Sequence, residues 1–198
     1  MNTPFVFVDI DTQFDFMRPE GGLYVPGAEG LEPGLARLIQ HARSHGIPIV
    51  ASADAHAPDD PEFSQFPPHC VKGTSGQKRV EATRIAEAQI LPNTPSDFNP
   101  EESQALVLEK TVFDIFGNPN AEAVFQAWAP ERCYVFGVAT DYCVRAAALG
   151  LRQRGYTVTV IEDAIKAVTP EGEARTLEEM RAAGVHFAKL EQVLEETK

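Results

Sequence analysis

The feature that most constrains the fold is a series of short, nearly continuous apolar runs separated by segments with helical periodicity. The runs cover residues 5–10, 47–52, 105–109, 133–138, 156–161 and 186–190. Continuous apolar runs are typical of parallel strands that are covered on both faces. Helices are expected near 31–45, 79–89, 121–128, 142–154 and 170–183, followed by a C-terminal helix. This alternation predicts a three-layer α/β/α architecture with a mostly parallel, Rossmann-like sheet of about six strands.

Length and composition exclude several classes of protein. The 198 residues, of which 43% are hydrophobic and 23% charged, predict a single domain over 1–198 with a sizeable core. No apolar run approaches membrane-spanning length, and the N-terminus lacks the basic start of a signal peptide, so we expect a cytoplasmic protein. The net charge of −12 argues against nucleic acid or an anionic membrane as a partner. A small-molecule substrate fits this composition, and a homo-oligomer is compatible with it.

The three cysteines do not form a framework of their own. Their number is odd, their spacings are wide and no C-x-x-C occurs, so neither disulfides nor a cysteine-built zinc site are expected. Cys143 differs from the other two because it lies in the first turn of an expected helix. The backbone N–H groups and positive end of that helix favour a thiolate and could also hold an oxyanion. The segment 135–143 is therefore suited to acyl transfer.

Chemically active residue types follow three of the expected strands. Asp11 follows the first strand, Lys110 the third, and Cys143 the fourth across a turn. Each has an ordinary explanation by itself, as a turn cap, a solvated lysine or a small buried side chain. Because the carboxyl ends of parallel strands meet at one edge of a sheet, the three could instead converge in one crevice. There Asp11 could accept the thiol proton, and Lys110 could stabilise both anions.

The long connection 53–77 carries a candidate metal site. Asp54, His56 and His69 offer one carboxylate and two imidazoles, a ligand set that suits zinc, iron or manganese and leaves positions open for substrate. Glu62 lies between them as a candidate fourth ligand. The alternative is that both histidines only bond to the loop backbone. A connection of this length in a compact domain is usually functional.

Four motifs together resemble the isochorismatase-like cysteine hydrolases, and within them the nicotinamidases (pyrazinamidases). Residues 11–16 (DTQFDF) resemble the D-x-Q-x-D-F motif, and Lys110 resembles the catalytic lysine after the third strand. Residues 137–144 (GVATDYCV) match the nucleophile motif. The metal loop of nicotinamidases is similar to Asp54-x-His56 followed by residues 67–74 (PPHCVKGT). The resemblance covers nearly the whole chain.

The resemblance implies a fold, a reaction and a cofactor. The expected fold is that of the isochorismatase-like hydrolases, with Asp11, Lys110 and Cys143 as the catalytic residues. The expected reaction is hydrolysis of nicotinamide to nicotinate and ammonia through a Cys143 thioester, a step of NAD salvage. One divalent metal ion, zinc in the first place with iron or manganese as alternatives, would be bound by the loop residues.

Finer details of the site are implied in the same way. A cis peptide bond is expected between Val138 and Ala139, and the N–H groups of Ala139 and Cys143 would form the oxyanion hole. Phe16 and Phe66 would form aromatic walls around the substrate ring, and either Phe113 or Phe116 would close the third side. Many nicotinamidases carry another loop histidine near the position of Glu62, which is therefore expected to bind the metal directly or through water.

Two other functions remain compatible with the sequence. A related cysteine hydrolase could act on a different amide or on a carbamoyl compound with the same three catalytic residues. A non-catalytic metal-binding protein could also retain this fold. The first predicts poor activity on nicotinamide, and the second predicts no turnover of any amide.

Overall fold

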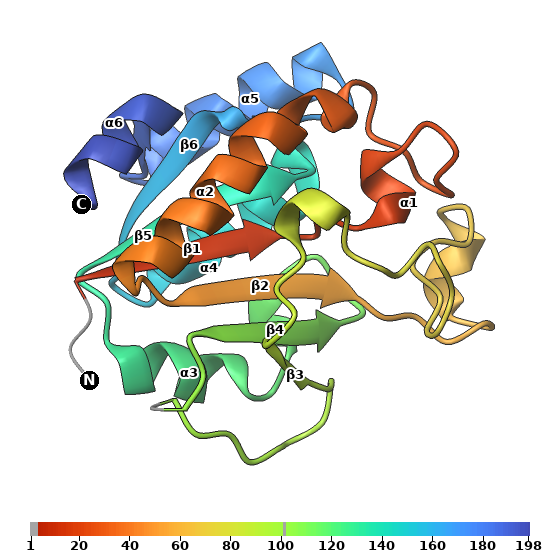
Figure 1. Cartoon of the computed structure of the whole chain (residues 1–198). Helices are drawn as coiled ribbons and strands as arrows, with labels where there is room; N and C mark the ends of the chain where they lie inside the picture. The colour runs from red at the N-terminus through yellow and green to blue at the C-terminus, as the bar shows by residue number, and fades with distance from the viewer. Residues whose placement is uncertain (1–3, 101) are drawn as a thin grey trace.

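The computed structural model describes residues 4–100 and 102–198, and its centre is one parallel sheet (Figure 1). Over these residues the sheet has seven strands in the order β3-β4-β2-β1-β5-β6-β7, and every neighbouring pair is parallel. The strands are β1 Phe5–Ile10, β2 Ile49–Asp54, β3 Gln89–Leu91, β4 Ala105–Lys110, β5 Arg132–Val138, β6 Thr157–Lys166 and β7 His186–Ala188. The predicted α/β fold class is confirmed.

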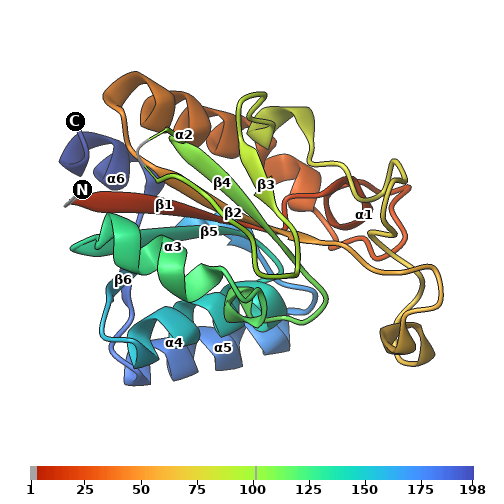
Figure 2. The same cartoon turned by 90° about the horizontal axis from the view of Figure 1, so that it is seen from below.

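Helices cover both faces of the sheet, as the continuous apolar runs predicted. Figure 2 shows α2 and α6 on one face and α3, α4 and α5 on the other. The helices are α1 Phe14–Met17, α2 Glu32–His45, α3 Ala121–Trp128, α4 Arg145–Gln153, α5 Pro170–Ala182 and α6 Leu190–Glu196. None of the helices in the described part of the chain is both long enough and apolar enough to cross a membrane.

The first strand illustrates why both faces must be apolar. Val6, Val8 and Ile10 are fully buried in the cluster that contains α3 and α4, whereas Phe7 is buried in the cluster beneath α2. Successive side chains of a strand point to opposite faces, so a strand with helices on both sides is mostly apolar on both faces. The buried Asp9 of β1 is the exception, and it forms an ion pair with Arg79.

The predicted helix near 79–89 is wrong. That segment contains only a 3-10 turn, Glu81–Thr83, and ends in the edge strand β3, which pairs with β4. β3 has only three residues, which is too few to show a periodic pattern in the sequence. Its extended conformation depends on pairing with the edge of β4. The strand predicted at 156–161 is also longer, because β6 continues to Lys166 past an irregularity in its pairing with β5.

The strand order places a switch point between β1 and β5. On one side of β1 the sheet continues with β2, β4 and β3, and on the other side it continues with β5, β6 and β7. Ligands of open α/β sheets bind outside the carboxyl ends of the strands at such a point. Asp11 directly follows β1, and Cys143 lies in the turn after β5. Both residues therefore lie at the switch point.

Candidate active site

The structure brings together the three residues that the sequence predicted to follow strands, although Lys110 is itself the last residue of β4. The Lys110 Nζ atom donates a hydrogen bond of 2.7 Å to Asp11 Oδ2 and lies 3.6 Å from Cys143 Sγ. Lys110 also forms an ion pair with Asp54 Oδ1. All four side chains are buried, with Asp11 and Lys110 fully inaccessible to solvent. An ammonium group buried between two carboxylates and a thiol is costly unless each partner is held in place.

Two polar residues hold the Asp11 carboxylate and the Asp54 backbone in place. The Ser52 hydroxyl donates a 2.6 Å hydrogen bond to Asp11 Oδ1. The Gln13 side chain accepts from the backbone N–H of Asp54 at 2.7 Å and donates to the Asp54 carbonyl at 2.8 Å. The sequence analysis gave neither residue a role. A signal for Gln13 was its place in the D-x-Q-x-D-F motif, whereas nothing in the sequence distinguishes Ser52.

Electrostatics in the site differ from the expectation at one point. Burial raises the pKa of the Cys143 thiol well above its ordinary value, and the Lys110 charge offsets only part of this shift. The helix start was expected to favour the thiolate, but desolvation is the stronger effect here. Burial also raises the pKa of Asp11. For Lys110, burial alone would lower the pKa, but Asp11 and Asp54 outweigh it and raise the value, so the lysine keeps its charge.

Cys143 lies in a tight turn directly after β5. The peptide bond between Val138 and Ala139 is cis, as the resemblance implied. A π-helical turn, Thr140–Val144, follows and leads into α4. The N–H groups of Tyr142 and Val144 both donate to the Ala139 carbonyl at 3.1 Å. The thiol is therefore held at the N-terminal end of the helical segment, with only 6% of the residue exposed.

The loop residues form a second cluster beside the first. One ligand atom from each of Asp54, His56 and His69 lies within 4.8 Å of the others, and all three residues are buried. The Asp54 Oδ2 atom lies 3.7 Å from His56 Nε2 and 3.9 Å from His69 Nε2. Asp54 therefore directs one oxygen to Lys110 and the other to the histidines.

The outer nitrogens of both histidines are already engaged. The Nδ1 atom of His56 lies 3.0 Å from Asp60 Oδ2, and that of His69 lies 2.8 Å from the Pro67 carbonyl. The buried Nε2 atom of His56 has no hydrogen-bond partner among the described residues. Metal-binding histidines commonly show this arrangement, with a carboxylate or carbonyl on one nitrogen and the other free for the metal.

The surrounding carboxylates make this cluster favourable for a cation. Burial by itself lowers the pKa of His56, but Asp54 and Asp60 outweigh it and raise the value to about 9. Glu62 completes a neighbouring group, because its carboxylate and that of Asp60 lie within 4.8 Å of a His56 nitrogen. The sequence analysis missed Asp60, although its position four residues after His56 was a usable signal.

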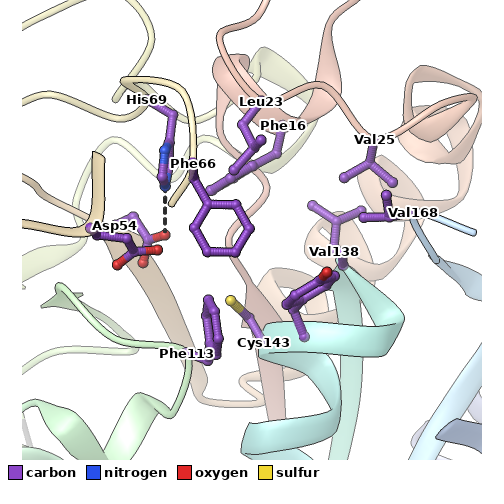
Figure 3. Close-up of a pocket in the computed structure, with 13 residues that line it drawn as sticks. Phe16, Leu23, Val25, Asp54, Phe66, His69, Phe113, Val138, Cys143 and Val168 are labelled. Carbon is purple, nitrogen blue, oxygen red and sulfur yellow. Dashed lines mark ion pairs between the residues drawn. The ribbon is translucent and has the colours of Figure 1, made fainter. Parts of the chain in front are cut away.

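The two clusters share one small cavity of about 90 Å³. Figure 3 shows the Cys143 thiol pointing into it, with Asp54 and His69 on one side and Val25 and Val168 on the other. The residues that line it are Phe16, Leu23, Val25, Asp54, Glu62, Phe66, His69, Phe113, Val138, Ala139, Tyr142, Cys143 and Val168. Pockets for drug-sized ligands measure roughly 300–1,000 Å³, so this cavity suits a smaller molecule.

Aromatic rings form one wall of the cavity. Phe66 and Phe113 meet edge to face at 6.1 Å between centroids, and Tyr142 contacts them at 6.2 and 5.4 Å. The Phe16 ring packs against His69 at 5.4 Å. Leu23, Val25, Tyr142 and Val168 line the cavity without having been predicted, because their apolar side chains carry no distinguishing signal.

Phe116 does not belong to this wall, which corrects one of the two alternatives for the third aromatic residue. The chain turns between Phe113 and Phe116 at the 3-10 helix Ile115–Gly117. Phe116 therefore packs against Phe125 at 5.4 Å, and the Arg154 guanidinium lies 3.6 Å above its ring. Its role is in the packing of α3 and α4.

Comparison with known proteins agrees with this geometry. The isochorismatase domain model matches residues 5–192, and the chain therefore belongs to the isochorismatase family of hydrolases. The chain is 29% identical over 200 residues to the nicotinamidase/pyrazinamidase of Mycobacterium tuberculosis, covering 90% of this chain and 95% of that one. It is 27% identical over 197 residues to a probable inactive nicotinamidase of Arabidopsis thaliana, covering 94% and 93%.

Solved structures with the same fold include enzymes for different substrates. The pyrazinamidase of Pyrococcus horikoshii in complex with zinc has a TM-score of 0.81 and 28% identity, covering 94% of this chain and 99% of that one. The N-carbamoylsarcosine amidase of Thermoplasma acidophilum has a TM-score of 0.75 and 26% identity, covering 96% and 97%. The fold alone therefore does not select the substrate.

Proposed function

We propose that the protein is a metal-dependent cysteine amidohydrolase that converts nicotinamide to nicotinate and ammonia. The observation that carries the proposal is the juxtaposition of Cys143 with a carboxylate–bis-imidazole cluster across one small cavity. The cluster around Cys143 supplies a nucleophile and its proton acceptor. The carboxylate–bis-imidazole cluster would hold a cation to which a ring nitrogen could bind. Relatives named nicotinamidase support the same choice.

The first half of the reaction begins with transfer of the thiol proton to Asp11. The Asp11 carboxylate and Cys143 Sγ lie within 4.8 Å of each other, and Lys110 contacts both. Because burial keeps the resting thiol protonated, a nearby base is required. The thiolate attacks the amide carbonyl, and Lys110, which contacts both groups, stabilises the negative charge as it moves from the Asp11 carboxylate to the sulfur.

The tetrahedral intermediate then releases ammonia. The N–H groups of Ala139 and Cys143 stabilise its oxyanion, and one well-placed donor contributes roughly 3 kcal/mol. Asp11 returns the proton to the leaving nitrogen, and the C–N bond breaks to give a thioester. Water attacks the thioester with Asp11 as base, and the same carboxyl reprotonates the Cys143 sulfur as nicotinate leaves.

The loop residues fit a divalent cation. Asp54, His56 and His69 are buried within ligand distance of one another, and the His56 Nε2 atom has no partner in the described chain. Zinc suits this set of one oxygen and two nitrogens best, with iron or manganese as alternatives, and Glu62 is the candidate for a further ligand, directly or through water. A bound cation would supply a Lewis-acidic position for the pyridine nitrogen and so orient the ring.

The charge of the cavity favours a neutral substrate. Its lining has the carboxylates of Asp54 and Glu62 and no lysine or arginine among the described residues. A divalent cation would balance these two negative charges, so no positive charge would remain in the cavity to pair with a carboxylate on the substrate. This favours nicotinamide over an anionic carbamoyl compound, which is one of the substrates that the rival function allows.

The test measures ammonia release from nicotinamide by protein loaded with zinc, iron or manganese. We expect turnover that is absent in Cys143→Ala and weak in chelator-treated protein. An anionic carbamoyl compound and pyrazinamide are assayed in parallel. Release of ammonia only from the carbamoyl compound would support the rival hydrolase, and no release from any amide would support a non-catalytic protein.

A further inference from the structure

One residue of the D-x-Q-x-D-F motif has no part in the chemistry above. Asp15 lies in α1, is half-buried and does not line the cavity. Each of its carboxylate oxygens accepts a backbone N–H group. Cys70 donates to Oδ2 at 2.7 Å, and Gly22 donates to Oδ1 at 3.0 Å. The backbone of Asp15 adds two bonds, to the Gly76 carbonyl and from the Leu23 N–H, both 3.1 Å long.

The bond to Cys70 links Asp15 to both imidazoles of the candidate metal site. Cys70 directly follows His69, so its N–H belongs to the peptide group that carries the His69 carbonyl. The Cys70 carbonyl accepts from the backbone N–H of His56 at 3.1 Å. One carboxylate oxygen therefore fixes the peptide on which the relative position of His56 and His69 depends.

The bond to Gly22 links Asp15 to the apolar side of the cavity. Gly22 precedes Leu23 and Val25, which both line the cavity, and Figure 3 shows Val25 on the side away from His69. The Val25 N–H donates a 2.9 Å hydrogen bond to the Phe16 carbonyl, so residues 22–25 are bonded to α1 at a second point. Asp15 thus lies between the wall at 23–25 and the histidine loop.

Three glycines allow the chain to close tightly around this carboxylate. A Cβ atom at Gly76 would lie 2.0 Å from Asp15 Oδ2, and one at Gly21 would lie 2.3 Å from the Asp15 carbonyl oxygen. A Cβ atom at Gly22 would lie 2.5 Å from the Pro68 carbonyl oxygen. Any larger residue at these positions would displace backbone or the carboxylate itself, so the position of Asp15 is closely determined by its surroundings.

We propose that Asp15 is a positioning residue that keeps His56 and His69 in ligand geometry and holds the 23–25 wall against the bound ring. This inference rests on the proposed metal site. Residues that orient metal ligands typically change metal affinity or activity by roughly 10- to 100-fold when they are replaced.

The test is Zn²⁺ titration of the metal-free protein by calorimetry, together with KM and kcat for nicotinamide at saturating zinc. Asp15→Asn keeps the shape but offers one oxygen to two N–H donors, so one bond is lost. We expect zinc to bind roughly 10- to 100-fold more weakly and KM to rise, with kcat within about threefold of the wild type. A merely structural role would lower the melting temperature without this change in zinc affinity and KM.

The matched control is Asp163→Asn. Asp163 also accepts a backbone N–H from another element, Leu190 at the start of α6, at 2.8 Å. It lies in β6, it does not line the cavity, and its replacement should leave zinc affinity and KM unchanged. A second variant, Gly76→Ala, tests the same contact from the opposite side by displacing the Asp15 carboxylate.

The outcomes separate this inference from the proposed function. Wild-type protein that binds no zinc and releases no ammonia overturns the proposed function. Wild-type zinc binding with an unchanged zinc affinity and KM in folded Asp15→Asn overturns the role of Asp15 alone. If Asp15→Asn does not fold, Gly76→Ala decides by the same criteria, and failure of both variants to fold makes Asp15 a folding residue and rejects the positioning role.

Discussion

The two halves of the candidate site are held in place by different parts of the fold. Lys110 is the last residue of β4, whereas Asp11 and Cys143 come one and five residues after β1 and β5. The three side chains are fixed by mutual contacts. His56 and His69 lie on the long connection after β2, where backbone hydrogen bonds and Asp15 determine their position. A scaffold that carries its reacting groups on a rigid sheet and its binding groups on a loop can keep its chemistry while its substrate changes.

Asp54 is the residue where the two halves meet. It is the last residue of β2, and its two oxygens face Lys110 and the histidines respectively. If each half keeps its own task, the sheet half determines kcat and the loop half determines substrate affinity. Four substitutions test it, from the largest expected effect on activity to the smallest.

Replacement of the nucleophile should have the largest effect. Cys143→Ala removes the attacking atom, so turnover of nicotinamide should fall by roughly 10⁶-fold. Ammonia release and the melting temperature are measured on the same preparation, and the fold should persist. Cys133→Ala is the matched control because Cys133 is a buried thiol of β5 that does not line the cavity; it should retain turnover. Substantial activity in Cys143→Ala would remove the thioester from the mechanism.

Replacement of the proton acceptor should have the next largest effect. Asp11→Asn keeps the shape, and its single oxygen can still accept from Lys110 while its amide group faces Ser52, but it cannot accept the thiol proton. We expect kcat to fall roughly 10²- to 10⁴-fold with little change in KM. Steady-state kinetics at saturating zinc measure both. A rise in KM with unchanged kcat would place Asp11 in substrate binding and contradict the division between the two halves.

A change in the loop half should mainly raise KM, whereas a change in the sheet half mainly lowers kcat. His69→Ala removes one imidazole ligand, so zinc affinity should fall roughly 100-fold or more and KM for nicotinamide should rise. The sheet half is untouched, so alkylation of Cys143 by iodoacetamide should proceed at the wild-type rate. Calorimetry, kinetics and mass spectrometry measure the three quantities. An unchanged KM in metal-free protein would reject an orienting role for the metal.

The aromatic wall should give the smallest effect. Phe66→Ala removes a ring contact of roughly 1 kcal/mol, which corresponds to about a fivefold rise in KM. Phe116→Ala is the matched comparison, because Phe116 packs under Arg154 and against Phe125. It should lower the melting temperature and leave KM unchanged. If Phe116→Ala raised KM as much as Phe66→Ala does, the assignment of the cavity wall would be wrong.

Much of the site could be predicted because its residues have distinctive chemistry at strand ends. Asp11, Lys110, Asp54, His56 and His69 were selected as candidates from residue type and position, and the structure brings them together. Ser52 and Asp60, which hold Asp11 and His56, were missed because their roles depend on distances between segments. Phe113 and Phe116 could not be separated, since the direction of each ring depends on the 3-10 turn between them.

The sequence by itself determined the layered α/β fold and the residue types of the chemistry, because apolar periodicity and strand-end position are local properties. Tertiary structure alone decided which oxygen of Asp54 faces which cluster, that β3 forms an edge strand, and that desolvation outweighs the helix start at Cys143. These outcomes depend on burial and on contacts between residues distant along the chain. A local pattern carries no information about either.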